Sequence, residues 1–210
     1  MEFTGEFETH LTVSLEGAAA LDALRRSAEG RGLKCLHIVL EQGQSRSQPM
    51  LTRRGRGILS SELAAAEAIR ADLAADGFNV TRIKIEAAPG NDDVPQTDED
   101  ATKQSGPRYF EHHVKLRLVP EAELAALVRL ALRHSAHVSQ NALRNDPDGS
   151  HERFVTQRCW HVGKITAGRH LQALLDDLAG GPWCQLDVEE EFVVYDSNLE
   201  VDAGWLQAGA

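Results

Sequence analysis

The stretch EFETHLTV, Glu6 to Val13, decides the fold because the second half of the chain repeats its core as YFEHHVKL, Tyr109 to Leu116. Both stretches contain Phe-Glu-x-His, at Phe7, Glu8 and His10 and again at Phe110, Glu111 and His113. In each, apolar side chains alternate with polar ones. This alternation predicts two strands, each with one buried face and one polar face.

The same succession of elements follows each stretch. In the first half we predict strands at 6–15, 33–41, 50–54 and 79–87 and helices at 17–30 and 60–75. In the second half we predict strands at 108–118, 136–140, 153–162 and 184–195 and helices at 120–135 and 168–181. KCLHIVL then corresponds to HSAHVSQ, PMLT to RFVT, and VTRIKIEA to QLDVEEEF. The order predicts an α+β protein, a tandem duplication of a ferredoxin-like βαββαβ unit with two antiparallel sheets.

Composition divides the chain into four parts. We expect a first lobe at 1–87, an acidic flexible linker at 88–107, a second lobe at 108–195 and a C-terminal segment at 196–210. The linker prediction rests on its acids, prolines, glycines and small polar residues, which offer little to bury. We expect Leu199 and Trp205 to dock the C-terminal segment onto the body, and a disordered tail is the alternative.

The polar faces of the two sheets are the candidate site. Both helices of a βαββαβ unit cover the apolar sheet face, so the polar face meets either water or its counterpart. In the second strand Leu36, Ile38 and Leu40 predict the buried face and place His37 on the polar one. We predict an interlobe cleft lined by Glu8, His10, Thr12, His37, Glu111, His113, Lys115 and His137. The alternative is that these are solvated outer faces of two independent sheets.

Acid-base chemistry is the first functional hypothesis. His10-Leu11-Thr12 resembles the His-x-Thr signature of the two-histidine phosphoesterases, in which each lobe supplies one such strand to a central cleft. The resemblance implies that His10 and His113 transfer protons and that Thr12 holds phosphate. Glu8 and Glu111 would orient the imidazoles. The second motif departs from the pattern, because Lys115 stands where a hydroxyl is expected and would hold phosphate by its charge.

Metal binding is the second hypothesis. Glu-x-His on a strand places both side chains on one face, so two facing copies offer Glu8, His10, Glu111 and His113 as a mixed nitrogen and oxygen set. Such a set suits a divalent transition metal better than calcium or magnesium.

A protein without catalytic activity is the third hypothesis. Arginines bind carboxylates and phosphates by bidentate hydrogen bonds, and Arg54 and Arg158 could hold an anionic metabolite in the cleft. Arg53, Lys84 and Arg117 are further candidates. The Arg-rich connection after the second strand is either a mobile lid over the cleft or a solvated loop.

Charge and composition exclude other classes. The net charge of −10 argues against nucleic acid as the main partner, and the sequence holds no apolar run long enough to cross a membrane. The N-terminus lacks the pattern of a signal peptide, so we expect a cytoplasmic protein. Three cysteines without CxxC spacing predict no disulfide framework. A homodimer is an open alternative, because edge strands can pair between chains.

The paired FExH phrase and the ending YDSN…DAGWL, at 195–198 and 202–206, resemble a group of uncharacterised bacterial proteins. The resemblance spans most of the chain and implies one two-lobed unit. It implies no activity.

Overall fold

The computed structural model describes residues 2–118, 124–144 and 151–204. The first half forms β1 (Thr4–Ser14), α1 (Ala18–Gly30), β2 (Lys34–Leu40), β3 (Ser47–Ile58), α2 (Leu59–Ala75) and β4 (Asn79–Ala87). After α3 (Asp98–Thr102) come β5 (Tyr109–Leu118), α4 (Leu124–Arg133), β6 (Ala136–Asn141), β7 (His151–Trp160), α5 (Lys164–Ala179), β8 (Cys184–Asp196) and a 3-10 turn, η1 (Leu199–Asp202). The predicted α+β class is confirmed.

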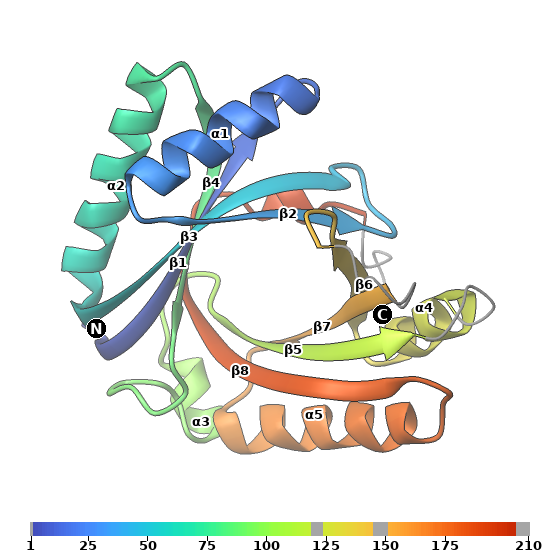
Figure 1. Ribbon diagram of the computed structural model, residues 1–210. Helices are drawn as coiled ribbons and strands as arrows, with labels where there is room; N and C mark the ends of the chain where they lie inside the picture. The colour runs from blue at the N-terminus through green and yellow to red at the C-terminus, as the bar shows by residue number, and fades with distance from the viewer. Residues whose placement is uncertain (1, 119–123, 145–150, 205–210) are drawn as a thin grey trace.

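The strands close into one barrel, in the order β1-β3-β2-β6-β7-β5-β8-β4 (Figure 1). The closure comes from two pairings between the halves: Ile38 of β2 lies opposite Asn141 of β6, and Lys84 of β4 lies opposite Asp196 of β8. The prediction of two separate sheets with a cleft between them was therefore wrong. Edge strands that pair with each other satisfy backbone groups that two open sheets would leave exposed.

The helices lie outside the barrel and the apolar cores lie beneath them (Figure 1). The outward side chains of β1, β3 and β4 pack with α1 and α2 in one cluster, which includes Leu11, Leu51 and Leu73. The outward side chains of β5, β6 and β7 pack with α4 and α5 in a second cluster, which includes Val114 and Leu127. The alternate residues, which are mostly polar except on β2, consequently face the barrel interior. Among the described residues, no helix has the length and apolar character needed to cross a membrane.

The segment between the halves is packed, in contrast to the solvated linker that its composition predicts. Val94 is buried in the first apolar cluster. Thr97 caps α3 in a capping box with Asp100. Asp98 accepts hydrogen bonds from the Gly163 amide at 2.8 Å and the Thr166 hydroxyl at 3.0 Å, which attaches α3 to the start of α5. The acids that suggest a linker thus act as caps and acceptors at helix N-termini.

The Arg-rich connection is a strand. Arg53, Arg54 and Arg56 all lie within β3, which runs from Ser47 to Ile58 and pairs with β1 from Met50 to Ile58. The arginines pair with acids: Arg54 contacts Glu8 at 2.8 Å, and Arg53 contacts Glu62 of α2. A regular ladder leaves no lid at this position.

Candidate functional site

A cavity of about 330 Å³ lies inside the barrel, and all eight strands contribute side chains to its wall. Of the side chains that the sequence proposes for the site, those facing it are Glu8, His10, Thr12, Arg54, Lys84, Glu111, His113, Lys115, His137 and Arg158. The structure therefore brings together nearly all of the predicted residues, although in a closed lumen and not between two lobes. Their roles stay predictions.

His37 faces away from the cavity, and its Nε2 lies 2.8 Å from the Ser47 hydroxyl. Arg53 and Arg117 do not line the cavity either. Leu36, Ile38 and Leu40, expected in a buried core, line the cavity in place of His37. The ladders place Lys34 opposite Thr52 and His137 opposite Thr156, so Lys34 is the positional counterpart of His137. The predicted alignment of KCLHIVL with HSAHVSQ was therefore shifted by an odd number of residues. Such a shift assigns every side chain of the strand to the wrong face of the sheet.

Each half contains the same chain of threonine, histidine and glutamate across three neighbouring strands. In the first half Thr52 Oγ1 lies 3.0 Å from His10 Nδ1, and His10 Nε2 lies 2.7 Å from Glu86 Oε2. In the second half Thr156 Oγ1 lies 3.0 Å from His113 Nδ1, and His113 Nε2 lies 3.2 Å from Glu191 Oε2. A hydroxyl on one ring nitrogen and a carboxylate on the other fix the orientation of each imidazole.

Buried cations hold the other carboxylates of the lumen. Lys84 contacts Glu86 and Glu111, each at 2.5 Å, and Arg158 contacts Glu111 at 2.6 Å. Although burial acts to raise it, the Lys84 ammonium and then His10 hold the pKa of Glu86 well below its usual range. Burial also acts to raise the pKa of Glu111, but Lys84 and then Arg158 hold it well below its usual range. Both carboxylates are thus ionised and neutralised inside the barrel.

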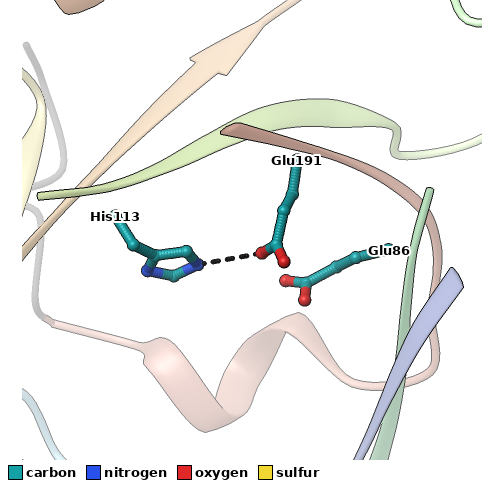
Figure 2. A group of neighbouring side chains, drawn as sticks. All are labelled: Glu86, His113 and Glu191. Carbon is teal, nitrogen blue, oxygen red and sulfur yellow. Dashed lines mark ion pairs between the residues drawn. The ribbon is translucent and has the colours of Figure 1, made fainter. Parts of the chain in front are cut away.

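Glu86 and Glu191 point toward each other, with His113 directed at Glu191 (Figure 2). Burial, and then repulsion from Glu86, raises the pKa of Glu191 to about 7. Burial alone would lower the pKa of His113, but the Glu191, Glu111 and Glu86 carboxylates raise it to about 9. Two facing carboxylates are stable when a proton or a cation lies between them.

The ligand atoms of Glu86, His113 and Glu191 all lie within 4.8 Å of one another, which makes these three a candidate metal site. This group shares only His113 with the set that the sequence suggests. Glu8 is ion-paired with Arg54, and its Oε1 lies 4.0 Å from His10 Nε2. Glu111 Oε1 also lies 3.4 Å from His113 Nε2, but Lys84 and Arg158 already hold this carboxylate. The set that the sequence suggests stays a prediction.

The chain after β8 closes one side of the lumen. Asp202 of η1 is buried and contacts Arg82 at 2.8 Å and Arg158 at 2.7 Å, and it accepts a hydrogen bond from Gln48 at 3.1 Å. Because Arg158 also holds Glu111, the C-terminal segment connects directly to the charged network. Leu199 is half-buried, and the prediction for Trp205 lies outside the described residues.

Four residues of this arrangement were missed as site residues: Thr52, Glu86, Thr156 and Glu191. Their signal was present, because the threonine recurs in PMLT and RFVT and the glutamate recurs in VTRIKIEA and QLDVEEEF. The pairing of strands was needed to place them next to His10 and His113.

No family model and no curated protein matches the chain. Among solved structures, the chain is similar to the crystal structure of aspartate kinase from Synechocystis, with 14% sequence identity and a TM-score of 0.25. The match covers 91% of this chain and 45% of the kinase chain, so the chain spans less than half the length of that structure. A likeness at this level supports no functional argument.

Proposed function

We propose that this protein is a metal-dependent enzyme that binds one divalent transition metal through Glu86, His113 and Glu191 and acts on a small molecule inside the barrel. The observation that supports this proposal best is the convergence of two carboxylates and an imidazole from three strands, with ligand atoms within 4.8 Å of one another. One nitrogen and two oxygen ligands suit zinc, manganese, iron or nickel. A site with three protein ligands leaves positions open for water and substrate.

Charge favours a metal over an anion at this position. Glu86 and Glu191 face each other, while the buried Lys84 and Arg158 are already bound to carboxylates. A divalent cation would relieve the repulsion that raises the pKa of Glu191. The small anionic substrate suggested by the arginines of the sequence receives less support, since Arg54, too, is ion-paired.

The remaining parts of the wall have roles consistent with this chemistry. A divalent metal held by Glu86, His113 and Glu191 would supply Lewis-acid chemistry and would lower the pKa of a bound water. His10 lies 2.7 Å from Glu86, where it orients that ligand and is placed to accept a proton. Thr156 orients the His113 ring from its other nitrogen.

Metal-free acid-base catalysis is the second candidate. The two histidine-glutamate pairs favour it, because one imidazole could accept a proton while the other donates one. In this candidate Thr12 and Lys115, which line the same cavity, would contact a phosphoester. Binding of an anionic metabolite without catalysis is a weaker proposal, because the buried Lys84 and Arg158 are already bound to carboxylates.

We also infer that the two halves are copies of one ferredoxin-like βαββαβ unit. The support is their shared strand order, β4-β1-β3-β2 and β8-β5-β7-β6, and the equivalent positions of the two Thr-His-Glu chains. Location in the cytoplasm stays a prediction.

Elemental analysis tests the metal. Wild-type protein, purified without chelators and then incubated with zinc, manganese, iron, cobalt or nickel before desalting, is expected to retain close to one metal per chain. His113→Ala is expected to lose it. The matched control is His134→Ala, because His134 contacts Asp177 on the outside of the barrel. Failure of the wild type to retain any of these metals, or equal retention by His113→Ala, would contradict the proposal and favour metal-free catalysis.

A further inference from the structure

The cavity has two unlike walls that face each other. Leu36, Ile38 and Leu40 of β2 line it on one side, and Asp187, Glu189 and Glu191 of β8 line it on the other. In the closed strand order β2 and β8 are four strands apart in both directions, so they lie across the lumen from each other, as Figure 1 shows. An apolar wall thus faces a row of carboxylates across a volume of about 330 Å³.

The apolar wall continues onto the neighbouring strands. Met50 of β3 lies opposite Leu36 in the ladder and also lines the cavity, as does Phe154 of β7. Leu36, Ile38, Met50 and Phe154 are half-buried, so part of each side chain is open to the lumen. Apolar surface of this kind inside a cavity binds hydrocarbon, because burial removes it from water.

Asp187 and Glu189 of β8 are exposed and available to a cation, whereas most cations that line the cavity are already paired with other carboxylates. The cations pair as follows: Arg54 with Glu8, Arg82 with Asp196 and Asp202, Lys84 with Glu86 and Glu111, Lys115 and Arg144 with Glu152, and Arg158 with Glu111 and Asp202. Lys34, which also lines the cavity, is exposed. Among the described residues, no lysine or arginine forms an ion pair with Asp187 or Glu189.

We propose that the cavity binds a small amphipathic amine, with its hydrocarbon part against Leu36, Ile38 and Met50 and its ammonium group at Glu189 and Asp187. The ammonium would compensate the carboxylates of β8, as Lys84 compensates Glu86 of β4 and Glu111 of β5. The inference that such an amine is the substrate of the enzyme rests on the proposed function. The inference that the metal-free protein binds such an amine does not depend on it and is tested separately.

Three probes of equal chain length separate charge from hydrocarbon. Chelator-treated, isotope-labelled protein is titrated with hexylamine, hexan-1-ol and hexanoate, and each dissociation constant is measured from NMR shift changes. We expect hexylamine to bind roughly tenfold more tightly than hexan-1-ol, the ratio that one favourable charge contact of about 1.4 kcal/mol produces. Hexanoate is expected to bind most weakly.

Two pairs of variants locate the two ends of the ligand. Glu189→Gln is expected to weaken hexylamine binding roughly five- to tenfold and to leave hexan-1-ol unchanged, while Glu190→Gln, on the outer face of the same strand, changes neither. Ile38→Ser is expected to weaken both probes, and the outward Val39→Ser neither. Circular dichroism and urea unfolding establish that each variant is folded.

Three results would overturn the inference. These are hexanoate binding as tightly as hexylamine, equal hexylamine binding by Glu189→Gln and Glu190→Gln, and the absence of shifts at the cavity with every probe. The metal plays no part in this titration, so amine binding without metal retention would sink the proposed function alone. Metal retention without amine binding would sink the substrate class alone.

Discussion

The two Thr-His-Glu chains have the same geometry, but the strand beside each histidine differs in charge. In the first half Lys84 lies opposite His10 in the ladder, and in the second half Glu189 lies opposite His113. The lysine neutralises Glu86 and Glu111, whereas the glutamate adds a negative charge beside Glu191. A basic partner thus neutralises the buried carboxylates beside His10, whereas the second half has an acid and no lysine at the equivalent position.

Removal of Lys84 is expected to have the largest effect on stability. Lys84→Met leaves Glu86 and Glu111 buried without their shared cation, and the loss of one partner from a buried ion pair costs about 3–5 kcal/mol. Urea unfolding at neutral pH measures this loss.

Glu189→Gln is the matched variant at the equivalent position, and since Glu189 is exposed, it is expected to change the free energy of unfolding by less than about 0.5 kcal/mol. Equal losses in Lys84→Met and Glu189→Gln would remove the difference between the two halves.

The pH dependence of stability is expected to have two limbs of opposite sign in the metal-free protein. The pKa of His113 rises from 6.5 to about 9 on folding. Its contribution to the free energy of unfolding is therefore complete below pH 6.5 and is lost as the pH rises through 9, with a slope of up to about 1.4 kcal/mol per pH unit. The raised pKa of Glu191, about 7, acts in the same direction from pH 4.5 upward.

The loss of stability in acid comes from the carboxylates that Lys84 holds, Glu86 in the first half and Glu111 in the second. Because the pKa of Glu86 is lowered, its contribution is present above pH 4.5 and is lost as the pH falls below that value. Urea unfolding from pH 3 to 10 measures both limbs, and His113→Gln is expected to flatten the alkaline limb while it leaves the acid limb in place. An unchanged alkaline limb in His113→Gln would show that His113 is not protonated in the folded protein.

The threonines are expected to give the smallest effects. Thr52→Val and Thr156→Val each remove one hydrogen bond to a histidine Nδ1, which costs about 1 kcal/mol of stability. Only Thr156→Val is expected to weaken metal binding, by roughly tenfold, because Thr156 orients a ligand. Calorimetric metal titration of the two variants makes the comparison, and equal weakening would place both histidines on the metal.

The sequence predicts the elements well and their association less well. Alternation in EFETHLTV and YFEHHVKL identifies the inward faces of β1 and β5, because period-two patterns reflect which face is buried. Barrel closure was not predictable, since it depends on long-range pairing of β2 with β6 and β4 with β8. His37 was misplaced because Leu36, Ile38 and Leu40 serve the cavity wall, where apolar residues imitate a core.

The residues of the candidate site were also only partly predictable from the sequence. His10 and His113 were predictable from a repeated motif within one strand. Glu86 and Glu191 join them from neighbouring strands, and no local spacing in a sequence encodes that approach. The segment at 88–107 shows that composition alone does not separate a linker from a packed connection, because Asp98 and Asp100 make their contacts as helix caps.

Anomalous diffraction from crystals soaked in manganese or cobalt would locate a metal bound by Glu86, His113 and Glu191. We expect one anomalous peak, at roughly 2.0–2.3 Å from the Glu86 and Glu191 carboxylates and from His113 Nε2. We expect no comparable peak at His10 and Glu8, where the carboxylate is already held by Arg54. A barrel interior without a peak, or a peak ligated by Glu8 and His10 instead, would contradict the proposed metal site.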